Sequence, residues 1–181
     1  MKHPLFKQDN LDIFMKEVVN KSHTDHFYSS LYNNIFSLKN PLWKYAENLK
    51  HLESSILIPY LNEEKFVKML RIHSHGNKNP PGLYNSKGPV IRMGEDNLSL
   101  HNFYENGYPS SHSVRDFLIT LKSVMAENSE INFDSCNQGK GEILKNISRF
   151  LCKDIKVVGF SGLGVPFIKG NISFKNGMRV D

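Results

Sequence analysis

The sequence predicts an α/β fold of three layers, a mostly parallel sheet flanked by helices, with a helical extension at its N-terminus. Three observations lead to this prediction. From residue 53 onward, short apolar runs typical of strands alternate with helical stripes, and this order gives parallel strands. The first 52 residues show mainly helical spacing. A chain of 181 residues suffices for one core, so we expect a single domain, 1–181, in which 1–52 form the extension and 53–181 the α/β core.

The N-terminal half begins with helical patterns. Apolar residues at helical spacing predict a first helix, on Leu11, Phe14, Met15, Val18 and Val19. A second helical zone is expected over 31–49. The apolar run 54–60 predicts a strand, and the alternating run 66–75 predicts another. Residues 76–112 carry most of the Gly, Pro, Asn and Ser, which indicates a long loop region with a small hairpin at 89–94.

The C-terminal half alternates between helix and strand. An apolar stripe predicts a helix that starts at Ser113 and buries Val114, Phe117, Leu118, Leu121, Val124 and Met125. A strand is expected at 131–133, directly before Asp134, Ser135 and Cys136. A second helix is expected to bury Ile143, Leu144, Ile147, Phe150 and Leu151. A buried strand at 155–160 and a terminal hairpin at 170–180 complete the pattern.

Composition and charge limit the classes of partner and compartment. The net charge is +5 and the pI about 9.1, but the lysines are scattered, so we expect no nucleic-acid partner. Two cysteines, Cys136 and Cys152, are too few for a disulfide framework and fit a reducing compartment. Residues 1–7 lack the apolar run of a signal peptide, and no stretch is long enough for a membrane span. We therefore expect a cytoplasmic protein, although specialised secretion into a host cell's cytosol would leave no such signal.

Two predicted strands end in residues suited to nucleophilic catalysis. One ends near His75 and Gly76, and the other ends at Cys136. If both strands lie parallel in one sheet, their carboxyl ends emerge at the same edge, where active sites of such sheets lie. An imidazole can take the proton of a thiol and so produce the nucleophilic thiolate. The backbone amides of Gly76 and Cys136 are then candidates to stabilise an oxyanion.

These residues carry a resemblance to a known family. His75-Gly76 after one strand and Asp134-Ser135-Cys136-Asn137-Gln138-Gly139 after the next resemble the caspase-like cysteine peptidases, which include caspases, metacaspases, clostripain and the self-cleaving protease domains of bacterial toxins. The motif is most similar to the metacaspase pattern Asp-x-Cys-His-x-Gly, with Asn137 in place of the His. The resemblance covers about residues 66 to 165. The family has two strands and two helices before its His strand, whereas the sequence predicts only the strand at 54–60 there.

The resemblance implies a thiol peptidase that acts on a protein or peptide, as in bacterial effectors and toxins. His75, Cys136 and Gly76 would be catalytic, and Asp134 and Ser135 would bind substrate. In metacaspases and clostripain the Asp two positions before the cysteine lines the pocket for a basic side chain, which implies cleavage after Arg or Lys. No metal or organic cofactor is required. Some relatives are activated by calcium or an inositol phosphate, so the resemblance is also compatible with an acidic small molecule as activator.

Plainer interpretations remain open. A cysteine at a strand end is usually a buried core residue, which would leave a catalytically inactive caspase-like domain that binds a partner. Asp134 could instead cap a turn or pair with Arg71 or Lys140. His73 and His75 could bind zinc, together with His101, His112 or Asp96, although His73 is better explained as packing against or supporting the site.

A further alternative rests on Trp43 and Glu47. They fit the W-x-x-x-E pattern of helical bacterial effectors that act on host GTPases, and on a helix the two residues would share a face.

Overall fold

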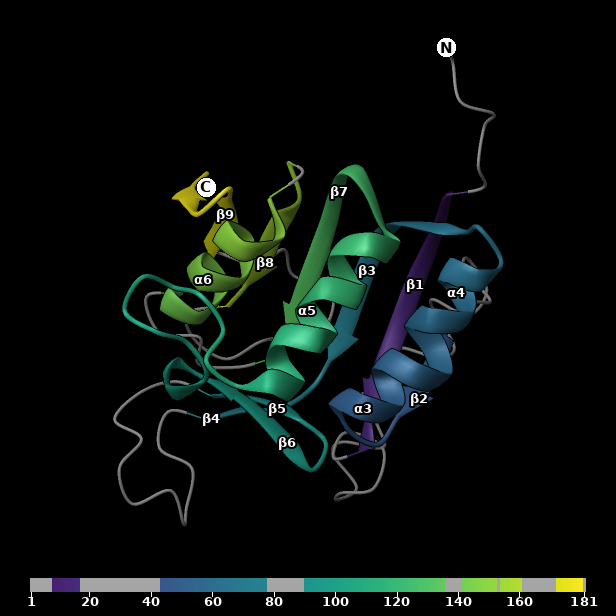
Figure 1. The fold of residues 1–181 in the computed structure, drawn as a ribbon, viewed down its shortest axis with the longest axis horizontal. Coiled ribbons are helices and arrows are strands. Elements are labelled where there is room, and N and C mark those ends of the chain that lie inside the picture. The colour runs from purple at the N-terminus through teal and green to yellow at the C-terminus, as the bar shows by residue number, and fades with distance from the viewer. Residues whose placement is uncertain are drawn as a thin grey trace.

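A computed structural model describes residues 8–16, 43–77, 90–135, 141–152, 154–160 and 172–180. Its centre is a seven-stranded sheet (Figure 1). In order across the sheet, the strands are β10 (Met178–Arg179), β9 (Ile172–Lys175), β8 (Lys156–Gly159), β7 (Met125–Asp134), β3 (Phe66–His73), β1 (Gln8–Met15) and β2 (Trp43–Ala46). The five strands from β8 to β2 are parallel, and β9 and β10 are antiparallel to their neighbours.

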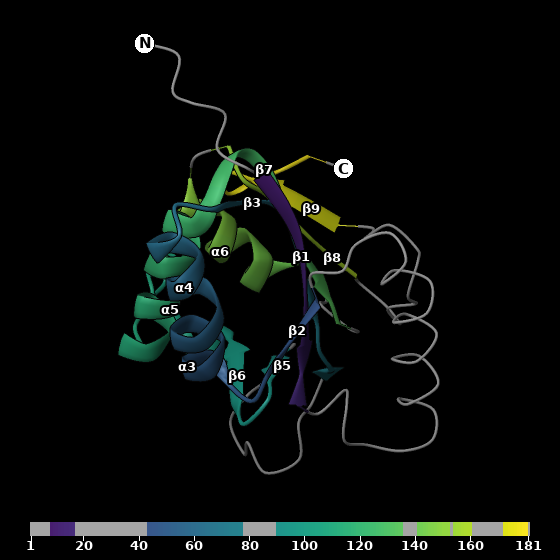
Figure 2. The same cartoon turned by 90° about the vertical axis from the view of Figure 1, so that its right-hand side faces the viewer.

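The described helices cover one face of this sheet, as the edge-on view in Figure 2 shows. They are α3 (Leu49–Leu52), the π-helical stretch η1 (Glu53–Leu57), α4 (Ile58–Asn62), α5 (His112–Val124) and α6 (Glu142–Leu151). Their apolar stripes pack on side chains that point to that face from the central strands, among them Ile13, Ile72 and Phe133. The main hydrophobic core therefore lies between the parallel strands and this helical layer.

A second, three-stranded antiparallel sheet follows β3. It consists of β4 (Gly76–Asn77), β5 (Val90–Met93) and β6 (Asp96–Ser99), and the 3₁₀ turn η2 (Leu100–Asn102) comes next. Figure 1 shows it below the carboxyl ends of β3 and β7. The Asp96 carboxylate accepts a hydrogen bond of 2.9 Å from the Leu49 amide, and the Glu95 amide donates to the Glu47 carbonyl. These bonds tie the tip of the β5–β6 hairpin to the start of α3.

Much of the predicted pattern is confirmed. The structure is an α/β fold with a mostly parallel sheet, as predicted. Of the helical layers expected on the two faces, the described residues show one (Figure 2). The confirmed elements are the strands β3, β7 and β8, the helices α5 and α6 and the β9–β10 hairpin. The hairpin expected at 89–94 is larger than predicted, because Val90–Met93 forms only its first strand and Asp96–Ser99 forms the second. β7 begins six residues before the expected strand at 131–133.

The helical prediction for the first 52 residues is confirmed only at its end, by α3, and was wrong for two other described segments. Residues 8–15 form strand β1 and 43–46 form strand β2, where helices were expected. In β1 both faces are buried, so the polar–apolar alternation of a half-exposed strand is lost and Leu11, Phe14 and Met15 imitate a helical stripe. The segment 54–60 is helical, within η1 and α4. The expected helical residues 31–38 lie outside the described residues.

Candidate functional site

Three neighbouring parallel strands bring polar side chains together at one place. Asp12 of β1 lies beside Arg71 of β3, and His73 at the end of β3 lies between Phe14 of β1 and Asp134 of β7. Alternation along each strand puts these side chains on the face opposite to Ile13, Ile72 and Phe133, and hence away from the helical layer. We call Asp12, His73 and Asp134 the carboxylate–histidine cluster.

His73 sits between two carboxylates. Its Nε2 is 3.0 Å from Oδ1 of Asp12, and its Nδ1 is 3.1 Å from Oδ2 of Asp134. Because both ring nitrogens face carboxylates, the arrangement favours the doubly protonated imidazolium. Burial disfavours this charge, but the hydrogen bonds and charges of Asp12 and Asp134 outweigh burial and raise the pKa of His73 above its ordinary 6.5. His73 therefore has no free nitrogen with which to accept a proton from a thiol.

Two further side chains support the ring from β1 and β3. The ring of Phe14 stacks on His73, with centroids 4.5 Å apart and planes inclined by 25°. Nη1 of Arg71 lies 3.6 Å from the second oxygen of Asp12, Oδ2. The buried Asp12 is thereby shared between two cations, and its side chain is only 3% exposed. These contacts fix the position of His73 within the sheet.

His75 and Gly76 lie where the chain leaves the large sheet for the small one. The Ser74 amide still donates to the Asp134 carbonyl, at 3.3 Å, whereas the His75 carbonyl accepts from the Arg92 amide of β5, at 2.8 Å. Gly76 and Ile91 are therefore a non-hydrogen-bonded pair, in which the Gly76 amide points away from β5. Both sheets thus hold the backbone around His75, whose side chain is partly buried.

The other predicted site residues follow β7. Asp134 is its last residue, and its side chain is 22% exposed. Ser135 is buried, with 1% of its surface exposed. The structure pairs Asp134 with His73, whereas Arg71, a partner of Asp134 that the sequence allowed, contacts Asp12. Cys136 and Lys140 lie outside the described residues.

The structure also bears on the two alternative sites. Trp43 begins strand β2 and Glu47 follows its end, so the helix on which the W-x-x-x-E interpretation depends is absent. Within the described ranges, no group of three or more His, Cys, Asp or Glu side chains is arranged to hold a metal ion. No helix in the same ranges is long and apolar enough to cross a bilayer.

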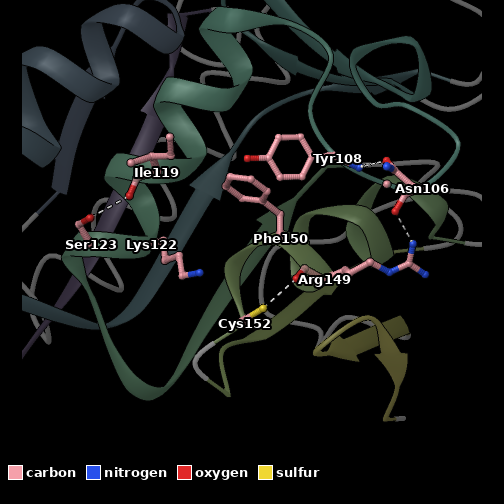
Figure 3. Close-up of a pocket in the computed structure, with 9 residues that line it drawn as sticks. Asn106, Tyr108, Ile119, Lys122, Ser123, Arg149, Phe150 and Cys152 are labelled. Atoms are coloured by element: carbon pink, nitrogen blue, oxygen red, sulfur yellow. Dashed lines mark hydrogen bonds between the residues drawn. The ribbon is translucent and has the colours of Figure 1, made fainter.

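A hollow of about 420 Å³ opens elsewhere, between α5, α6 and the loop before α5 (Figure 3). Tyr108 and Phe150 meet edge to face in it, with ring centroids 5.3 Å apart. Arg149 donates to the Asn106 carbonyl, and the exposed Cys152 thiol donates to the Arg149 carbonyl. Because α5 and α6 cover the opposite face of the sheet, the carboxylate–histidine cluster does not line this hollow.

Sequence reasoning missed Asp12 and underrated His73. Asp12 stood in a segment with a helical pattern, and nothing local indicates that β1 pairs with β3. The signal that could have found the pair is a buried-looking carboxylate flanked by Leu11 and Ile13, because such a residue needs a cationic partner. Comparison with known proteins adds no assignment: no family model, curated protein or solved structure matches the chain.

Proposed function

We propose that this chain is a caspase-like cysteine peptidase that uses His75 and Cys136 and cleaves after a basic residue. The observation that carries the proposal is the register of β3 and β7. These strands are adjacent and parallel, and His73 is aligned with Asp134. In the sequence, His75 and Cys136 each follow a member of this aligned pair by two residues.

The order of elements adds support. The caspase-like resemblance calls for two strands and two helices before the His strand, and the sequence patterns offered only one strand there. Two parallel strands, β1 and β2, and the helical run from α3 to α4 precede β3 in the chain. One crossover helix, α5, lies between β3 and β7 in the chain, and the caspase-like resemblance calls for one between its His strand and its Cys strand.

The charge pattern distinguishes the two histidines. His73 is bound on both nitrogens by Asp12 and Asp134, so the role of base falls to His75. His75 would take the proton of the Cys136 thiol, and the sulfur would attack the scissile carbonyl carbon. The peptide C–N bond then breaks as His75 returns the proton to the leaving amine, and a thioester remains. Water, deprotonated by His75, hydrolyses the thioester and restores the thiol.

The remaining roles are those that the caspase-like resemblance implies, and three structural observations bear on them. The Gly76 amide, which points away from β5, would donate to the oxyanion together with the Cys136 amide. The partly exposed carboxylate of Asp134 would receive the basic side chain before the cut. Because the Ser135 side chain is buried, it would contribute its backbone rather than its hydroxyl to substrate binding.

Affinity labelling tests the proposal directly. The wild-type chain is incubated with lysyl and arginyl peptide chloromethyl ketones, with and without calcium and an inositol phosphate, and the labelled cysteine is identified by mass spectrometry. We expect label on Cys136, with labelling lost in His75→Gln. The exposed Cys152 is an internal control for general alkylation, and Cys152→Ser is the matched variant that should label normally. An inert Cys136 in the folded wild type would refute the peptidase and favour a silent caspase-like domain.

A further inference from the structure

The two oxygens of the Asp134 carboxylate have different surroundings. Oδ2 lies 3.1 Å from Nδ1 of His73. Among the residues that the structure describes, none forms a hydrogen bond or ion pair with the other oxygen, Oδ1. The Asp134 side chain is 22% exposed, so the carboxylate is tethered to His73 by one oxygen and is only partly buried.

His73 cannot readily turn away from Oδ2 of Asp134. Its other nitrogen, Nε2, is 3.0 Å from the buried Asp12 carboxylate, and its ring is stacked on Phe14. Turning the ring away from Asp134 would also break the contact with Asp12 and leave that buried carboxylate with only the longer contact to Arg71, which is costly. The one-sided tether of Asp134 is therefore a fixed property of the fold.

This tether discriminates between the two basic side chains. A guanidinium binds a carboxylate best as a fork, with two parallel N–H bonds to the two oxygens. On Asp134 that fork would have to share Oδ2 with Nδ1 of His73, which brings the guanidinium against a second cation. An ammonium is a compact charge that needs only one oxygen, so it can bind Oδ1 on the side away from His73.

We propose that His73 is a specificity-determining residue, which restricts Asp134 to a one-oxygen contact and makes the chain cleave after Lys in preference to Arg. The inference rests on the proposed peptidase function and names its substrate class: peptides with Lys before the scissile bond. Asp12 and Phe14 act through His73, as positioning residues that keep its ring against Asp134.

The experiment measures kcat/KM for two fluorogenic peptides that differ only in Lys or Arg before the reporter group. For the wild type we expect a Lys-to-Arg ratio of about ten, the equivalent of one charge-assisted hydrogen bond lost by Arg. His73→Phe keeps a ring to stack on Phe14 but removes the tether, so both oxygens become available and the ratio should fall to about one or below. A ratio within one enzyme is independent of the fraction of active protein.

Asp12→Asn is the matched control, because its amide oxygen can still accept from Nε2 while His73 continues to face Asp134. Its ratio should stay within about threefold of the wild-type value. Should His73→Phe fail to fold, Asp134→Glu is the second variant. Its side chain is one methylene longer, which moves the carboxylate away from the His73 ring and should lower the Lys-to-Arg ratio as well. A wild-type preference for Arg, or an unchanged ratio in the folded His73→Phe or Asp134→Glu variant, would overturn the inference while leaving the peptidase intact. If neither peptide is cleaved and Cys136 resists both chloromethyl ketones, the proposed function fails and this inference with it.

Discussion

Replacing His73 by Phe should destabilise the fold, because its imidazole joins three strands through two carboxylates. The ring contacts Asp12 at 3.0 Å and Asp134 at 3.1 Å, and the Asp12 side chain is 3% exposed. Breaking a buried ion pair by removing one partner costs about 3–5 kcal/mol. The stack on Phe14 can survive in the variant, so we expect a loss of about 3 kcal/mol in the free energy of unfolding at about pH 6.

The loss should depend on pH in a defined direction. The pKa of His73 is raised in the fold above 6.5, because the contacts with both carboxylates outweigh the effect of burial. A raised pKa means that the stabilisation is fully present below the unfolded value of 6.5 and disappears as the pH rises through the higher folded value. Each unit of upward shift contributes about 1.4 kcal/mol. The difference between wild type and His73→Phe should therefore shrink at alkaline pH.

Urea unfolding followed by circular dichroism, at a series of pH values and extrapolated to water, measures both effects. The double variant Asp12→Asn/His73→Phe is the control for an unpaired carboxylate. It should be more stable than His73→Phe alone, since it leaves no charged Asp12 without its imidazolium. If His73→Phe loses less than about 1 kcal/mol in the free energy of unfolding at about pH 6, or if the loss does not change with pH, the description of His73 as a buried imidazolium is refuted.

Three further predictions concern the rest of the fold. Gly94→Ala should cost at least about 2 kcal/mol in thermal or urea unfolding, because Gly94 has φ +71° and an added Cβ would meet the Glu47 carbonyl oxygen at 1.6 Å. Gly177→Ala has a similar φ of +78°, but its added Cβ would come no nearer than 3.0 Å to the Arg149 side chain, so it should cost less; equal costs would contradict this. Phe133→Ala should lower the free energy of unfolding by about 3–5 kcal/mol, since the ring is fully buried, and a loss under about 1 kcal/mol would show that the core is not packed as described. Cys152→Ser should change the free energy of unfolding by less than about 0.5 kcal/mol and leave kcat/KM for the proposed peptide hydrolysis unchanged. A tenfold drop in kcat/KM would instead show that the Cys152 thiol takes part in the reaction.

The second half of the fold could be predicted from the sequence because its signals are local. The stripe that includes Val114, Phe117 and Leu121 repeats at helical spacing on a helix with one buried face, and α5 forms there. The signals fail where burial is two-sided. In β1, Phe14 and Leu11 are both buried, so the chain there shows no alternation that identifies a strand. The run 54–60 is short and apolar, a pattern that strands and buried helices share, and it is helical in η1 and α4.

By itself, the sequence determined which residues follow two of the strands: His75 and Gly76 after one, and Ser135 and Cys136 after Asp134 at the end of the other. Only the tertiary structure decided what surrounds them. Asp12 and His73 are 61 residues apart, and they meet because β1 lies beside β3 and β3 beside β7. The lateral order of parallel strands depends on crossover connections and on burial of whole faces, which no local pattern encodes. That order makes His73 a partner of both Asp12 and Asp134.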